Sequence, residues 1–384
     1  MGEYNYSALA IPLFLLLMAL EWWAARQKQR PLHRLNDSVA SLSMGSLLLV
    51  SDALLKGLTF AAFIYLFEQH RLFDFSIDSP FTWLLFFLGV DLCYYGFHRC
   101  AHAINLLWGA HVGHHQSEEF NLTTALRQSA FQYAFSWVFY LPLALLGCPP
   151  LLFLLQFVLL KAYQFWLHTQ LIQRIPLLEG IFSTPSSHRV HHAKNPLYVD
   201  RNYGGTLVIW DRLFGSWQPE LATEPCHYGT TKPLDTFNPI KANLQHWQML
   251  AQDSINTRRN WDKVRLWWMP TGWRPADCLA ADEHAVAQQH DGCGNRAKFD
   301  PATSQGARFY AAVSMLALMQ LLLPLVWLAP QLSVGTAMVG LILVLGSVVV
   351  INVLFEGRRI WAWLEPARWL ALLWFSAELW LRIG

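Results

Sequence analysis

The 384-residue chain has too few charged residues for an ordinary soluble protein, since Asp, Glu, Lys and Arg make up 14% of it and hydrophobic residues 54%; soluble domains average roughly 25% charged residues. A net charge of +2 without long Lys/Arg runs excludes a basic surface for nucleic acid. The six cysteines lack CxxC spacing, which argues against a zinc ribbon or a disulfide framework and favours a reducing compartment. Composition predicts an integral membrane protein and leaves its oligomeric state open.

Hydrophobic stretches predict an all-α fold with several membrane spans. A bilayer core needs about 20 apolar helical residues, and roughly eight stretches approach that length. The first, residues 7–23, has no basic n-region and no A-x-A site, which is typical of an anchor and not of a cleaved signal. The others lie within 41–67 and 81–97, at 131–146 and 151–167, and at 307–328, 334–355 and 367–381. Gly147, Pro149 and Pro150 predict a tight hairpin between the fourth and fifth.

The basic residues orient these spans. Short loops rich in Lys and Arg stay in the cytoplasm, and the first span is followed by Arg26, Lys28, Arg30 and Arg34. Counting forward from the loop after the first span, residues 68–80 lie on the side opposite the cytoplasm, and the chain after the third span lies in the cytoplasm. The sequence therefore predicts a helical bundle whose functional groups after that span face the cytoplasm.

Eight histidines follow the predicted spans in three clusters. They are His98 and His102, then His111, His114 and His115, then His188, His191 and His192. Residues three or four apart share one face of a helix. Crowded imidazoles repel or desolvate one another unless something coordinates them. We therefore expect these eight side chains to bind metal.

The number and type of ligands narrow the metal. Imidazole suits zinc, copper, iron and nickel, and eight imidazoles exceed what one tetrahedral zinc ion uses. Two ions are therefore predicted, and an apolar substrate beside them favours iron that activates O2. The number of ligands is also compatible with a dinuclear zinc hydrolase, which remains an alternative. A metal-binding transporter or sensor is a further alternative, but it would place its ligands within or across the spans.

Three more residues are candidates near this site. Asp91 lies two turns before His98 on the same helix face, where it can orient an imidazole or only form a pair inside the span. His168 ends the hairpin on the metal side and is a candidate ninth ligand or second donor to the metal site. Lys161 either extends its ammonium to the membrane surface or meets an anionic headgroup.

Two polar stretches flank the last two histidine clusters. The first has helix-face spacing and either holds a substrate headgroup or cofactor or forms the polar face of an interfacial helix. Its residues are Asn121, Thr124, Arg127 and Gln128. The second either forms a polar shell that closes the site from water or makes a tight turn before an amphipathic helix. Its residues are Asp200, Asn202, Tyr203, Trp210, Asp211 and Arg212. No catalytic residue beyond the metal ligands is predicted.

The histidine motifs carry a family resemblance. The strings HRCAH (98–102), HVGHHQSEEFNLTTALRQS (111–129), YQFWLHTQLI (163–172), TPSSHRVHHAKNP (184–196) and DRNYGGTLVIWDRLFGSW (200–217) resemble the fatty acid hydroxylase and sterol desaturase superfamily of membrane di-iron oxygenases. The likeness continues weakly into the terminal spans. It implies that the eight histidines bind two irons and that one oxygen atom of O2 enters a C–H bond of a membrane lipid.

Within the superfamily, the motifs are most similar to the enzymes that cleave glycerol ether lipids. In that branch the hydroxylated carbon lies beside the ether oxygen, and tetrahydrobiopterin supplies the electrons in the animal enzymes. The resemblance leaves a lipid or sterol desaturase with the same centre as an alternative. The chain has no GxGxxG, haem-attachment or ferredoxin motif, so we expect an external reductant or electron-transfer protein.

Three positions depart from the animal enzymes of that branch. Ala103 and Gln170 stand where those enzymes carry glutamate, and Ser187 replaces a histidine. These differences favour a bacterial inner-membrane enzyme with its own electron donor.

The sequence also suggests a division of the chain into four parts. We expect N-terminal transmembrane helices in 1–80, a catalytic domain with the hairpin in 81–217, a cytoplasmic or interfacial segment in 218–306, and C-terminal transmembrane helices in 307–384.

Overall fold

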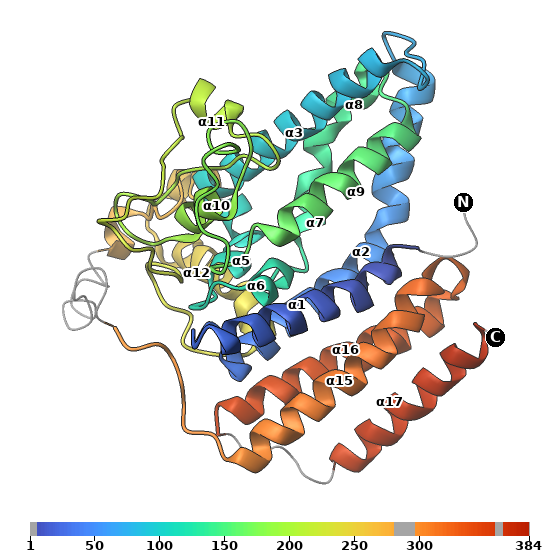
Figure 1. The fold of residues 1–384 in the computed structure, drawn as a ribbon, viewed down its shortest axis with the longest axis vertical. Helices are drawn as coiled ribbons and strands as arrows, with labels where there is room; N and C mark the ends of the chain where they lie inside the picture. The colour runs from blue at the N-terminus through green and yellow to red at the C-terminus, as the bar shows by residue number, and fades with distance from the viewer. Residues whose placement is uncertain (1–5, 280–295, 358–363, 384) are drawn as a thin grey trace.

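The computed structural model describes residues 6–279, 296–357 and 364–383, and within these ranges the protein is helical with only isolated β-bridges. The long helices run side by side, and the short helices and loops with the histidines gather at one end of them (Figure 1). The N-terminal half begins with a 3-10 turn and three long helices: η1 (Tyr6–Leu9), α1 (Ala10–Gln27), α2 (Leu35–His70) and α3 (Pro80–Ala103). The predicted all-α membrane fold is confirmed.

Fewer helices than predicted are long and apolar enough to cross a membrane. Among the described residues these are α3, α15 (Gln305–Trp327) and α16 (Val334–Phe355). Helix α2 is a fourth if its two parts, which meet at a bend of 48° after Ala53, count as one span. Helix α1 and the last helix, α17 (Leu364–Leu381), each have 18 residues and fall outside this set. Within the described residues, the estimate of roughly eight spans is therefore corrected to three or four helices of sufficient length and apolar composition.

The predicted hairpin forms, but its first arm is not one continuous helix. It consists of α7 (Gln132–Ser136), the 3-10 turn η2 (Trp137–Tyr140) and α8 (Leu141–Leu146). Gly147 has φ +100°, and a Cβ there would lie 1.9 Å from the carbonyl oxygen of Phe73, so only glycine fits the turn. The second arm, α9 (Pro150–Trp166), has 17 residues and is about 25 Å long, less than the roughly 30 Å of a bilayer core.

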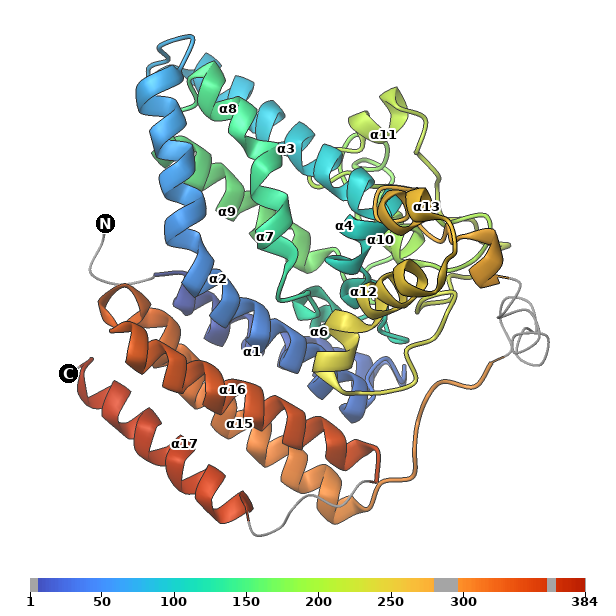
Figure 2. The ribbon, with the colours of Figure 1, turned by 180° about the vertical axis from the view of Figure 1, so that it is seen from behind.

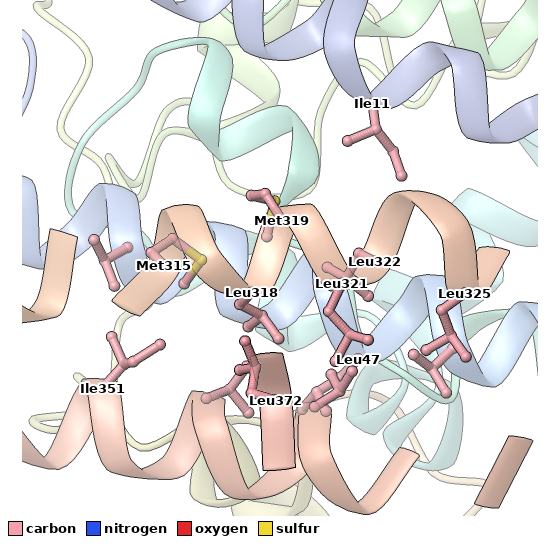
Figure 3. Packing of buried hydrophobic residues seen from close by; sticks show 14 of the residues in the cluster. Ile11, Leu47, Met315, Leu318, Met319, Leu321, Leu322, Leu325, Ile351 and Leu372 are labelled. Atoms are coloured by element: carbon pink, nitrogen blue, oxygen red, sulfur yellow. The ribbon is translucent and has the colours of Figure 1, made fainter. Parts of the chain in front are cut away.

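The C-terminal helices pack on the N-terminal ones. Helices α15 and α16 contact α2, and α17 packs on α15 and α16. Figure 3 shows the apolar side chains that join them, among them Leu47 of α2, Leu318 of α15 and Ile351 of α16. Asn352 donates a hydrogen bond to Ser43 Oγ (2.7 Å), which also links α16 to α2. The 3-10 turn η3 (Ala329–Gln331) connects α15 to α16.

The histidines lie in the last turns of α3, at and within α5 (Val112–His115), within α10 (Pro185–His192) and just after α9, and other short helices surround them beyond the end of α3. These helices are α4 (Asn105–Gly109), α6 (Leu122–Leu126) and α11 (Ile209–Leu213). Two further helices, α12 (Pro239–Asn256) and α13 (Asn260–Arg265), cover this end (Figure 2). Asn105 holds them by donating to the carbonyl oxygens of Leu266 (2.9 Å) and Trp273 (3.0 Å). Residues 280–295 of the segment 218–306, which the sequence predicts to be cytoplasmic or interfacial, lie outside the described residues.

Candidate metal centre

The structure brings nine histidines together in two groups that can each hold a metal ion. The first group is His98, His102, His111, His115 and His191, and the second is His114, His168, His188 and His192. Within a group the ligand atoms all lie within 4.8 Å of one another, and every member is buried. The eight predicted residues and His168 therefore share one location.

The two groups do not coincide with the sequence clusters. Residues four apart point to the same group, as the predicted helix spacing requires: His98 with His102, His111 with His115, and His188 with His192. Residues next to each other point to different groups, as His114 and His115 do in α5 and His191 and His192 do in α10. Helices α5 and α10 thereby each contribute to both groups.

The spacing of the imidazole nitrogens fits metal binding. In the first group, Nε2 of His111 lies 3.1 Å from Nε2 of His98 and 3.2 Å from Nε2 of His115. In the second group, Nε2 of His168 lies 3.3 Å from that of His114 and 3.0 Å from that of His188. Two nitrogens that bind one ion at about 2.1 Å and at 90–110° are roughly 3.0–3.4 Å apart.

The Nδ1 contacts of five histidines indicate that their Nε2 atoms carry lone pairs. Carbonyl oxygens accept hydrogen bonds from Nδ1 of His98 (Tyr203, 2.9 Å), His114 (Arg127, 2.9 Å), His168 (Gln164, 3.0 Å) and His191 (Arg201, 3.0 Å). Gln132 Oε1 accepts from Nδ1 of His111 at 3.3 Å. A neutral imidazole protonated on Nδ1 has no proton on Nε2, so the facing Nε2 lone pairs repel unless a cation lies between them.

Burial disfavours the charged imidazolium, so the histidines of the two groups that follow α3 in the chain are neutral. It lowers the pKa of His111 and His168 to about 3 and that of His191 to about 4. Nε2 of His191 and Nε2 of His192 are buried and have no hydrogen-bond partner among the described residues. Because metals bind the neutral imidazole and a buried polar atom without a partner is costly, the donor set fits two metal ions.

Two buried carboxylates hold the loop that follows α10. Asp211 accepts hydrogen bonds from the main-chain N–H of Tyr203 (2.7 Å) and Gly204 (2.8 Å). Asp91 accepts from the N–H of Thr206 (2.7 Å), from that of Leu207 and from the indole of Trp210 (3.0 Å). Among the described residues, the Asp91 oxygens are therefore turned to this loop and not to an imidazole. The loop in turn presents the Tyr203 carbonyl to His98.

The other residues predicted around the last histidines support the site in different ways. Asp200 Oδ1 lies 3.2 Å from Nδ1 of His102, although the Asp200 side chain is largely exposed. Asn202, with φ 57°, donates to the carbonyl oxygens of Ser187 (3.0 Å) and Gln218 (2.7 Å). Ser187 itself completes a capping box with Thr184 at the start of α10. The polar stretch therefore holds the site together.

The predicted polar stretch 121–128 has structural contacts and one residue in a cavity. Asn121 caps α6 by accepting from the N–H of Thr123 (3.0 Å). Arg127 is buried and donates from Nε to the carbonyl oxygen of Gly113 at 2.9 Å. Gln128 lies 3.1 Å from Nδ1 of His114 and lines the cavity described next.

An apolar cavity of about 390 Å³ opens onto the second histidine group. Its histidine end is lined by His111, His114, His168 and His188. The rest of its wall is mainly aliphatic and aromatic and comes from α1, α2, α3, α9 and α15, with the segment 132–141. Such a cavity suits a long apolar chain, because burial of apolar surface favours binding.

Sequence reasoning missed three residues that hold the site. Glu21 of α1 is buried and accepts a hydrogen bond from Leu122 N–H at 2.7 Å. Gln132 orients His111 from the hairpin. Arg189 donates to the carbonyl oxygen of Thr169 (3.0 Å), next to His168. The position of Glu21 within the first apolar stretch is a signal of such a role, because a buried carboxylate needs hydrogen-bond partners.

Comparison with known proteins agrees with this geometry. A family model described as fatty acid hydroxylase matches residues 83–216, which include all nine histidines. The alkylglycerol monooxygenase of Xenopus tropicalis is 37% identical over 372 residues, which are 96% of this chain and 81% of that protein. The chain belongs to the alkylglycerol monooxygenase family. The human alkylglycerol monooxygenase is 40% identical over 314 residues, 80% of this chain and 68% of that protein.

Membership of the alkylglycerol monooxygenase family makes this protein a membrane lipid hydroxylase, an enzyme of the oxidoreductase class. A desaturase relative is more distant. A Delta(7)-sterol 5(6)-desaturase of Aspergillus fumigatus is 28% identical over 163 residues, 38% of this chain and 42% of that protein. No solved structure matches the chain.

Proposed function

We propose that this protein is an O2-dependent di-iron monooxygenase that hydroxylates a membrane ether lipid at the carbon beside the glycerol ether oxygen. The observation that carries the proposal is the meeting of two buried imidazole groups with an apolar cavity of about 390 Å³. The names of the Xenopus tropicalis and human relatives support an alkylglycerol as the substrate.

We assign all nine histidines as ligands, in the two groups that the geometry forms. Five imidazoles in one group exceed the four positions of tetrahedral zinc, which supports iron. When bound, iron would supply the activation of O2 that C–H oxidation requires. The surrounding residues keep Nε2 of four ligands directed inward, through the Nδ1 contacts of His98, His114, His168 and His191.

The cavity wall determines where the lipid reacts. A carbon held at the end formed by His111, His114, His168 and His188 is exposed to the metal centre, while the apolar wall excludes water from it. Desaturation is the alternative outcome of the same centre. The sterol desaturase relative matches a smaller part of the chain than the alkylglycerol monooxygenases do, which favours hydroxylation.

The proposal also covers the electron donor, the side of the membrane on which the metal site lies, and the domain organisation. Electrons come from an external donor, either a tetrahydrobiopterin-type pterin or an electron-transfer protein. Arg26 lies in the last turn of α1 and Lys28 and Arg30 follow it, and Arg30 donates to the carbonyl oxygen of Gln170 (2.8 Å) near His168, which supports a cytoplasmic metal site. The proposed location is a bacterial inner membrane, because Ala103 and Gln170 stand where the animal enzymes carry glutamate. The proposed domain organisation has four parts, with boundaries after residues 80, 217 and 306.

Metal analysis and product identification test the function. Detergent-purified protein is expected to contain about two irons per chain and to convert an alkylglycerol, with O2 and a reduced pterin, into a long-chain aldehyde and glycerol. Two tightly held zinc ions, with no O2 uptake on reduction, would overturn the di-iron proposal. A product that has lost two hydrogens and gained no oxygen would identify a desaturase. His70→Ala, at the exposed end of α2, is the control variant and should match the wild type.

A further inference from the structure

A lysine lines the cavity beside the metal centre. Lys161 lies five residues before the end of the apolar helix α9. Its Nζ is 4.6 Å from the ring centre of Tyr94 and 5.6 Å from that of Phe157. Its hydrogen-bond partner is Gln164 Oε1, at 3.4 Å, and in the part of the chain that the structure describes it forms no ion pair. A cation inside an apolar helix is costly and is a functional candidate by default.

Three glutamines line the same end of the cavity. Gln132 contacts Nδ1 of His111, and Gln128 contacts Nδ1 of His114. The main-chain oxygen of Gln164 accepts a hydrogen bond from Nδ1 of His168. Lys161 joins them through Gln164. We call Gln128, Gln132, Lys161 and Gln164 the amide–lysine group. These contacts place the group at the histidine end of the cavity.

The amide–lysine group has unused hydrogen-bonding capacity. Gln128 Oε1 is buried and has no hydrogen-bond partner in the part of the chain that the structure describes. The Lys161 ammonium has three N–H donors and uses one, and that one in a long bond. Ammonium donors match ether and hydroxyl oxygens, and amides match hydroxyls because both can donate and accept. The group itself contains a cation and no carboxylate, and the acid that lines the same cavity, Asp52 of α2, is not part of it.

We propose that the amide–lysine group is a headgroup subsite, which hydrogen-bonds the hydroxyl and ether oxygens of the substrate lipid beside the metal centre. The alkyl chain then extends into the apolar remainder of the cavity. This inference rests on the proposed function and deepens it, because it orients the lipid head-first and makes Lys161 a specificity-determining residue. Only a carbon near the headgroup then lies beside His111 and His114.

The test compares two lipids with the same alkyl chain. One is an alkylglycerol and the other is the alkyl methyl ether, which keeps the C–H bond beside the ether oxygen but lacks both hydroxyls. Binding is measured anaerobically on the metal-loaded protein, and turnover with O2 and reductant. Lys161→Met should weaken alkylglycerol binding about tenfold, the effect of about one lost hydrogen bond to a charged donor, and methyl ether binding less than about twofold.

Two further variants separate recognition from packing. Lys161→Arg keeps a cationic donor and should restore most of the alkylglycerol affinity. Lys241→Met removes a charge from the exposed face of α12 and should leave both affinities unchanged. Equal weakening of both lipids by Lys161→Met, or no change in either, would overturn the subsite. Selective binding that depends on Lys161 without oxidation of alkylglycerol would support the subsite and reject the proposed function.

Discussion

Glu21 in α1 accepts a hydrogen bond of 2.5 Å from the hydroxyl of Thr169, the residue directly after His168. The same carboxylate accepts from the Leu122 N–H (2.7 Å) and lies 3.1 Å from Nε2 of His33. The N-terminal helix therefore fixes the segment that carries the ninth histidine. This support lies outside residues 83–216, the range that matches the fatty acid hydroxylase model.

Removal of the Glu21 carboxylate should loosen that segment. Glu21→Leu leaves a buried N–H and a buried hydroxyl without an acceptor, and we expect a loss of roughly 2–4 kcal/mol in the free energy of unfolding. Glu21→Gln keeps one acceptor oxygen and should lose less. Thermal unfolding in detergent measures both, with Glu68→Gln at the exposed end of α2 as control. Equal stability of Glu21→Leu and the control would show that the contact is unimportant.

Asp211 should affect metal retention without being a ligand. Asp211→Ala removes the acceptor of the Tyr203 and Gly204 N–H groups, so the Tyr203 carbonyl no longer has a fixed position against His98. Loss of such an indirect partner typically lowers metal affinity about 10–100-fold. Chelator competition measures this affinity. Ser216→Ala removes only one contact to the same carboxylate (2.7 Å) and should have a smaller effect. An unchanged affinity in Asp211→Ala contradicts the argument.

His168 should be required for one ion only. His168→Ala removes one of the four nitrogens of the second group and none of the five of the first. We expect metal content to fall from about two ions per chain to about one and lipid hydroxylation to be lost. Elemental analysis of the purified variant measures the first effect and product formation the second. Two ions and normal turnover in this variant would remove His168 from the ligand set.

A histidine outside the metal centre should contribute a pH-dependent stability. His246 of α12 donates from Nε2 to the Asn105 carbonyl oxygen (2.9 Å), and burial lowers its pKa to about 4. The unfolded chain binds a proton near pH 6.5 and the folded chain does not. Stability is therefore present above pH 6.5 and falls as the pH decreases toward about 4.

The control for this effect is His246→Gln, which does not titrate in this range. The difference in melting temperature between wild type and His246→Gln should narrow as the pH falls from 7.5 to 5. A constant difference over this range would show that His246 does not contribute by protonation.

Much of the membrane architecture follows from local sequence. Helices α3, α15 and α16 lie where hydropathy predicts them, because length and apolar composition suffice for a span. The hairpin turn follows from Gly147 and its neighbouring prolines. The broken first arm was not predictable in this way, since its helix, 3-10 turn and second helix have the same apolar composition as a continuous helix.

The histidine spacing was sufficient to predict a shared metal site, because residues four apart on a helix must point the same way. The assignment of His114 and His115 to different groups depends on where α5 lies against α3 and α10. Asp91 shares a helix face with His98, yet it contacts residues 206–210, which pack against α3 only in the folded chain.

The sequence by itself determined that this is a helical membrane protein with clustered imidazoles, because hydropathy and helix periodicity are local properties. Only the tertiary structure decided the division of nine histidines into two groups, the role of Glu21 and the place of Lys161 in the cavity. These features join residues far apart in the sequence: the two groups span His98 to His192, and Glu21 and Thr169 are 148 positions apart. Such contacts depend on how helices pack, which no local pattern specifies.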